Sequence, residues 1–163
     1  MPEFQPNRVL LNENDERAID QVYGLIKERM QDIKGKFVLV VSGTSTNVGK
    51  SYVHRALLRR FESDNIKVTG SKTPEDLPKM AFGIEDDDRV VMFSEMWEMG
   101  FPSVKSVEKI RGLINQSIAK ASGGIIDSVD FWVAVETKES PFLQPFTPAD
   151  IIIHNLGAQN KYA

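Results

Sequence analysis

The sequence contains no cysteine, no long apolar run and no strong excess of charge of either sign. Without cysteine, the chain forms no disulfide, no thiolate metal site and no cysteine nucleophile. No apolar stretch approaches the roughly 20 residues that a helix needs to cross a bilayer. Residues 1–14 carry neither the basic segment nor the apolar core of a signal peptide. We therefore expect a cytoplasmic protein without a membrane partner.

The charge balance limits the partners that composition supports. Lysine and arginine number 20, against 23 aspartate and glutamate residues, which gives a net charge of −3. This balance does not support a broad basic surface for nucleic acid. The 41% hydrophobic and 9% aromatic content is typical of an ordered globular chain, and 163 residues suit one compact domain.

Three segments show the three- and four-residue spacing of apolar side chains that predicts an amphipathic helix. They cover 13–33, 50–63 and 103–121. Glycines follow the first and the third segment, at Gly35 and at Gly123-Gly124. Glycine is a common stop at the C-terminal end of a helix, so these positions mark the predicted helix ends.

Short apolar runs between the helices predict strands. The clearest is Phe37-Val-Leu-Val-Val41, which is typical of a strand buried on both faces of a parallel sheet. Further strands are predicted at 66–69, 89–93, 131–135 and 151–153, and a loop at 74–88. The alternation of strands and helices indicates an α/β fold with three layers, a mostly parallel sheet and an extra N-terminal helix.

A glycine-containing loop, Gly43-Thr-Ser-Thr-Asn-Val-Gly49-Lys50-Ser51, follows the first of these strands and precedes the helix at 50–63. In that context, main-chain N–H groups surround a phosphate and the helix N-terminus adds positive charge. The motif predicts that Lys50 contacts the outer phosphates as a catalytic residue and that the Ser51 hydroxyl binds Mg²⁺. The candidate ATP-binding residues are Gly43, Thr44, Ser45, Thr46, Asn47, Val48, Gly49, Lys50, Ser51 and Tyr52.

The loop departs from the common pattern G-x-x-x-x-G-K-[ST], because five residues rather than four separate Gly43 from Gly49. A chance Gly-Lys-Ser triplet in a surface turn is the alternative interpretation. The strand before the loop and the helix after it favour a phosphate loop. We therefore predict a P-loop NTPase-like nucleotide-binding domain over 36–163 and an N-terminal helical extension over 1–35, within one compact domain.

The five-residue spacing resembles the phosphate loop of dethiobiotin synthetase, whose pattern is G-T-x-T-x-V-G-K-T. Residues 68–74, Val-Thr-Gly-Ser-Lys-Thr-Pro, are similar to that family's second strand and its Gly-x-Lys-Pro segment. Residues 129–136, Val-Asp-Phe-Trp-Val-Ala-Val-Glu, are similar to its strand ending in Val-Glu. The resemblance implies an ATP-dependent ligase in which Lys72 is a catalytic lysine that helps bind the substrate, and Glu136 serves the Mg²⁺ site.

The chain also departs from that family. Thr137-Lys-Glu-Ser140 stands where the family has a Gly-Ala-Gly-Gly turn, and Ser45 and Asn47 replace acidic loop residues. The same superfamily includes the partition and cell-division ATPases of the ParA and MinD type. Their signature lysine early in the loop has no counterpart at 44–46.

Two other groups of residues are candidates for chemistry. The run Glu85-Asp-Asp-Asp88 offers four carboxylates for a cation, but runs of this kind are usually solvated loops. His54 and His154 lie far apart in the sequence, with no third metal ligand at a suitable spacing. We expect both histidines to be structural.

Three functions remain open at this point. The first is an ATP-dependent ligase or kinase-like enzyme that uses ATP and Mg²⁺. The second is a nucleotide-switched module, in which ATP controls homodimer formation or partner binding, and the missing Gly-Ala-Gly-Gly turn favours it. The third is a phage or plasmid structural protein that keeps the P-loop fold without nucleotide turnover.

Overall fold

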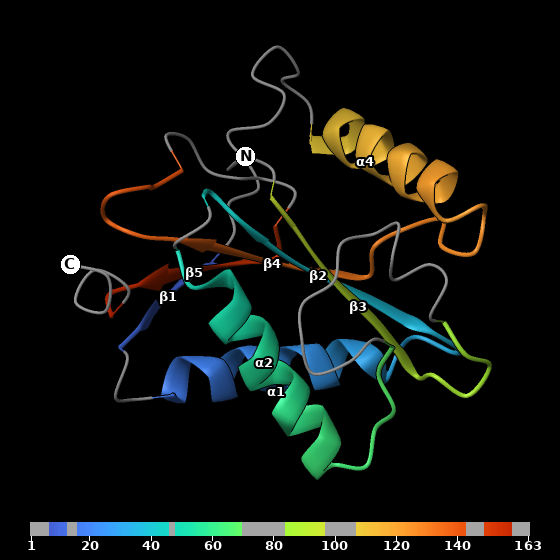
Figure 1. Cartoon of the computed structure of the whole chain (residues 1–163), viewed down its shortest axis with the longest axis horizontal. Helices are drawn as coiled ribbons and strands as arrows, with labels where there is room; N and C mark the ends of the chain where they lie inside the picture. Colours follow the sequence, from blue (N-terminus) through green and yellow to red (C-terminus); the bar gives the residue numbers. More distant parts are fainter. Residues whose placement is uncertain are drawn as a thin grey trace.

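Eight helices and strands make up the part of the chain that the structure describes (Figure 1). A computed structural model describes residues 7–12, 16–45, 48–69, 84–96, 107–142 and 149–157. In chain order, the elements are β1 (Asn7–Leu11), α1 (Arg17–Met30), β2 (Phe37–Gly43), α2 (Lys50–Ser63), β3 (Val90–Met96), α4 (Val107–Ala121), β4 (Phe131–Glu136) and β5 (Ile151–Asn155).

The five strands form one sheet in the order β1-β5-β4-β2-β3, and every neighbouring pair is parallel. Gly43, the last residue of β2, pairs with Val135 of β4, and Glu136 of β4 pairs with His154 of β5. Because the strands are parallel, their last residues lie at the same end of the sheet. We call this end, with Gly43, Glu136 and Asn155, the carboxyl edge.

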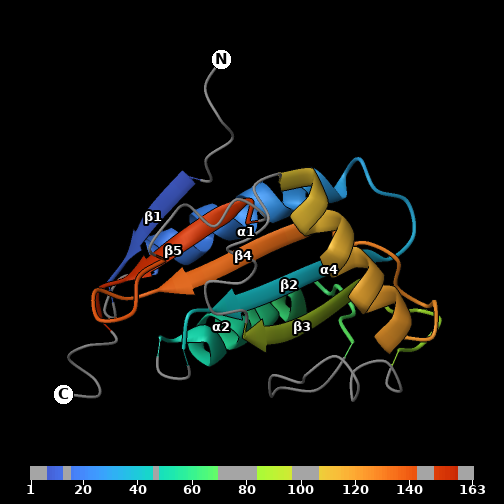
Figure 2. The same cartoon turned by 90° about the horizontal axis from the view of Figure 1, so that it is seen from above.

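Helices cover both faces of the sheet (Figures 1 and 2). On one face, α1 and α2 pack on a core that includes Val53 and Leu39, and on the other face Ile118 of α4 packs with Val40. Successive residues of β2 point to opposite faces, and the whole strand is buried. The α/β class and the three-layer arrangement predicted from the sequence are confirmed, with a sheet that is parallel throughout.

The order of the strands reverses at β2. From β2 the chain passes through α2 to β3, then returns through α4 to β4 on the opposite side of β2. The two helices lie on opposite faces of the sheet (Figure 2). In open α/β sheets, ligands bind beyond the carboxyl ends of the strands at such a reversal. The ends of β2 and β4 are therefore the expected ligand position in this fold.

The N-terminal segment contains a strand that the sequence analysis did not predict. β1 pairs with β5 and forms one edge of the sheet. Val9 and Leu11 are buried, whereas Arg8 and Leu10 are exposed, so the two-residue period spans only four positions and gives a weak sequence signal. Together with α1, β1 shares the core formed by α2 and β2.

Other helices and strands differ in their bounds from those predicted from the sequence. The strand predicted at 66–69 is reduced to a single bridge between Val68 and Val90, because only one residue pair there reaches β3. The strand predicted at 89–93 extends to Met96, and the first helix begins at Arg17. Residues 70–83, which hold most of the predicted loop, lie outside the described part. None of the described helices is both long enough and apolar enough to cross a bilayer.

A buried histidine connects α2 to β3. Nδ1 of His54 lies 2.7 Å from the hydroxyl oxygen of Ser94, and the imidazole is 3% exposed. Burial lowers the pKa of His54 to about 4, and the positive charges of Arg55 and Lys50 act in the same direction. The folded protein therefore holds His54 in its neutral form, as the structural role predicted for it requires.

This burial makes stability depend on pH. Above the unfolded-state pKa of about 6.5, His54 is neutral in both states and the stabilisation is fully present. As the pH falls from there towards 4, only the unfolded chain binds the proton. We expect this group to remove about 3 kcal/mol of unfolding free energy over that interval. Urea denaturation across this range should show the loss, and His54→Gln should flatten the slope. Equal slopes for both proteins would contradict the assignment.

Candidate phosphate-binding site

The loop between β2 and α2 is closed by two glycines. A Cβ at Gly43 would lie 2.8 Å from a side-chain methyl carbon of Val48, which is itself 1% exposed. Gly49 has a φ of +98°, in the left-handed region, and a Cβ there would collide with the side-chain nitrogen of Asn155. Only glycine suits both positions, so the chain folds back tightly before α2. Thr46 and Asn47 lie outside the described residues.

Thr44 joins the start of this loop to the segment after β4. Its N–H donates to the carbonyl of Val135 at 3.2 Å, and its hydroxyl donates to the carbonyl of Ser140 at 2.6 Å. Ser140 in turn donates its N–H to the hydroxyl of Thr137 at 3.1 Å. The segment 137–140 is thus hydrogen-bonded to the loop through the side chain of Thr44.

Asn155 holds the other end of the loop. Its side-chain amide donates to the carbonyl of Val48 at 3.0 Å, and its oxygen accepts the N–H of Gly157 at 3.0 Å. Asn155 is 5% exposed. The sequence analysis did not identify this residue. The signal that was present is the polar pair His154-Asn155 after the apolar run 151–153, where a strand of an α/β sheet ends.

The N-terminus of α2 combines the positive end of the helix with the side chain of Lys50. The first N–H groups of any α-helix have no partner within the helix. The N-cap residue, Gly49, has no side chain that could form a capping hydrogen bond, and the first turn of α2 contains no acidic residue. Lys50 is half-buried at the first position of the helix, and Ser51 follows it on the exposed side. This arrangement suits an anion.

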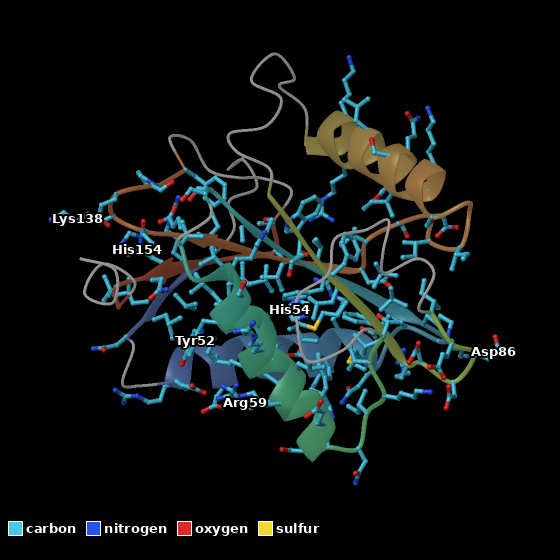
Figure 3. All side chains as sticks on the ribbon, viewed as in Figure 1. Tyr52, His54, Arg59, Asp86, Lys138 and His154 are labelled. Carbon is cyan, nitrogen blue, oxygen red and sulfur yellow. The ribbon has the colours of Figure 1, made fainter. Side chains whose placement is uncertain are left out.

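Tyr52, the last residue of the predicted ATP-binding set, contacts the segment before α1. Its hydroxyl donates to the carboxylate of Glu16, just before α1, at 2.5 Å. Burial raises the pKa of Tyr52 to about 12, and the hydrogen bond to Glu16 adds to the effect. On the same helix, Arg60 contacts Glu16 at 3.0 Å and Asp20 at 2.8 Å. These contacts connect α2 to α1 (Figure 3).

Glu136 lies at the carboxyl edge, and both of its carboxylate oxygens have partners. Oε2 lies 2.7 Å from Nδ1 of His154 and 3.4 Å from Nε of Arg8, while Oε1 accepts the N–H of Phe142 at 3.2 Å. The side chain is 4% exposed. In the described ranges, no group of three or more histidine and acidic side chains is arranged to hold a metal ion.

The remaining candidates are Lys72 and the acidic run at 85–88. Lys72 is outside the described residues. The acidic run at 85–88 precedes β3, so it lies at the opposite end of the sheet, where Figure 3 labels Asp86. Lys67 binds Glu85 at 2.9 Å and Asp87 at 2.5 Å, which raises the pKa of Lys67 and lowers that of Asp87. Two of the four carboxylates in this run therefore form ion pairs with Lys67.

Alanine substitutions at Gly49 and at Gly24 should change the free energy of unfolding in opposite directions, because only Gly49 is tightly packed. Gly49→Ala adds a methyl group against Asn155 at a left-handed residue, and we expect it to lower the unfolding free energy by about 1–3 kcal/mol. Gly24→Ala in α1 meets open space, and we expect a gain of roughly 0.5–1 kcal/mol. Urea denaturation of both variants measures the difference. Two variants of equal stability would refute the tight packing at Gly49.

No family model, no curated protein and no solved structure matches this chain. What the chain does is therefore inferred from the carboxyl edge itself.

Proposed function

We propose that the chain binds Mg-ATP on the loop 43–51 and transfers or releases its terminal phosphate, as an ATP-dependent ligase or kinase-like enzyme. The observation that carries the proposal is the loop with two tightly packed glycines in front of a helix that begins with Lys50 and has no acidic residue in its first turn. Its position at the reversal of strand order supports the same conclusion. The spacing of the loop, which resembles dethiobiotin synthetase, favours ATP.

Each part of the loop has a role in holding the phosphates. The main-chain N–H groups at the start of α2 face an anion without competition from an acidic side chain. The ammonium group of Lys50 adds a full positive charge for the outer phosphates. The Ser51 hydroxyl is placed in the same turn to bind Mg²⁺, which when bound neutralises phosphate charge. The predicted metal role of Glu136 is not carried into this proposal, because both carboxylate oxygens already accept hydrogen bonds.

A second candidate is a nucleotide-switched module in which ATP controls homodimer formation or a partner. The hydrogen bond from Thr44 to Ser140 favours it, because a change in the loop on nucleotide binding would reach the exposed residues Lys138 and Glu139. Light scattering with and without Mg-ATP separates the two candidates, since only a switch changes the molecular mass.

Lys50→Ala tests the proposal directly. Loss of a charge-assisted contact costs about 1.5–3 kcal/mol, so we expect the dissociation constant for Mg-ATP to rise at least roughly tenfold. Isothermal titration calorimetry measures it. Lys34→Ala is the matched control, because Lys34 is exposed and precedes β2 at the opposite end of the sheet. Unchanged affinity in Lys50→Ala, or an equal loss in the control, would overturn the proposal.

Asn155 and Asn115 provide a second matched pair. In Asn155→Asp a carboxylate replaces the amide that donates to Val48, so it repels that carbonyl and loosens the loop. In Asn115→Asp the oxygen that accepts the N–H of Val129 is retained. We expect Mg-ATP affinity to fall about tenfold or more in the first variant and to stay within about twofold in the second. Comparable affinities in both would show that Asn155 does not position the loop.

A further inference from the structure

Three ionisable side chains meet at the carboxyl edge, on the face of the sheet opposite α2. They are Arg8 of β1, Glu136 of β4 and His154 of β5. Arg8 is 43% exposed, Glu136 is 4% exposed and His154 is 22% exposed. The strand order places β5 between β1 and β4, which explains how residues 128 positions apart come together. Figure 3 labels His154 beside Lys138 at this end of the molecule.

The contact with Glu136 determines which ring nitrogen of His154 carries the proton. An ionised carboxylate only accepts hydrogen bonds, so Nδ1 of His154 donates the bond to Oε2 of Glu136 at 2.7 Å. The guanidinium of Arg8 lies 3.4 Å from the same oxygen and forms an ion pair with the carboxylate. In the neutral imidazole, the proton is therefore on Nδ1 and Nε2 keeps a free lone pair.

Nε2 of His154 is accessible. Among the described residues it has no hydrogen-bond partner, and no buried side-chain nitrogen or oxygen in those ranges lacks one, so Nε2 reaches solvent. An imidazole with one nitrogen fixed by a carboxylate and the other open is the arrangement of a general base.

Two short stretches of chain connect the pair to the hydrogen bonds that hold the phosphate loop. The residue after His154 is Asn155, whose side chain holds the carbonyl of Val48. The residue after Glu136 is Thr137, which binds Ser140, and Ser140 accepts the hydroxyl of Thr44. Both partners of the pair are thus one residue away from the groups that hold the two ends of the loop.

We propose that His154 is the general base for phosphoryl transfer at this edge and that Glu136 positions it. This role rests on the proposed function, because it needs a nucleoside triphosphate on the loop 43–51. It also gives the buried carboxylate a function without a metal ion. Neither histidine chemistry nor this pairing was expected from the sequence, where His154 was predicted to be structural.

With water as the nucleophile, the step balances as follows. The water oxygen forms a bond to the γ-phosphorus and gives one proton to Nε2 of His154. The bond from that phosphorus to the β–γ bridging oxygen breaks, and ADP leaves with the electron pair. The imidazolium is stabilised by the carboxylate of Glu136 until it returns the proton to solvent.

The tautomer of His154 can be measured without any activity. The chain has two histidines, so ¹⁵N-edited spectra of the imidazoles contain two sets of signals, and His154→Gln identifies its own set. At mildly alkaline pH, we expect neutral His154 to carry its proton on Nδ1. A proton on Nε2 would overturn the proposal, because that nitrogen could not then accept another.

Turnover tests the base role itself. General-base catalysis contributes about 10²- to 10⁴-fold, so we expect His154→Gln to lower kcat for phosphate release at least roughly 100-fold, with Mg-ATP affinity within about threefold. Glu136→Gln should give an intermediate fall.

The experiments distinguish a failure of the role proposed for His154 from a failure of the proposed function. A kcat within about threefold of wild type in His154→Gln, or bound Mg-ATP with no phosphate release by the wild-type chain, overturns the role of His154 alone. Failure of Mg-ATP to bind the wild-type chain overturns the proposed function, and the base role with it. Lys34→Ala serves again as the surface control for both measurements.

Discussion

A hydrogen bond from the side-chain amide of Asn155 to the carbonyl of Val48 joins β5 to the loop in front of α2. The hydroxyl of Thr44 joins the start of the same loop to Ser140 after β4. Both bonds require three parallel strands to end at one edge in the observed register. Because side chains alternate between faces, a one-residue slip of β5 would exchange the faces of His154 and Asn155. The register of the sheet therefore maintains the loop.

At the carboxyl edge, the negative charge is paired, whereas the positive helix start has no acidic residue in its first turn. The one buried carboxylate, Glu136, is balanced by Arg8 and His154. The N-terminus of α2, with Lys50, has no acidic residue in its first turn. Acidic residues elsewhere on α1 and before β3 are paired with Arg60 and Lys67. An anion that approaches the carboxyl edge thus meets positive charge at α2, while the carboxylate nearby is already satisfied and shielded from solvent.

Local patterns determined most of the secondary structure. The apolar run at 37–41 and the helical spacing at 50–63 each predicted an element that the structure contains, because both patterns are continuous over several residues. β1 was not predicted, since its alternating pattern is short and its pairing partner, β5, is more than 140 positions away in the chain. For the same reason, the strand expected at 66–69 is only a bridge: pairing depends on residues that a local pattern does not contain.

By itself the sequence determined an α/β fold and the position of a glycine-containing loop between a buried strand and a helix, because these features depend on residues adjacent in the chain. Only the tertiary structure decided the strand order and the partners of that loop. Asn155 and Thr44 act through contacts 107 and 96 positions away, and Glu136 has His154 and Arg8 beside it through strand pairing. Such groups become neighbours only when parallel strands align, so no local spacing could have revealed them.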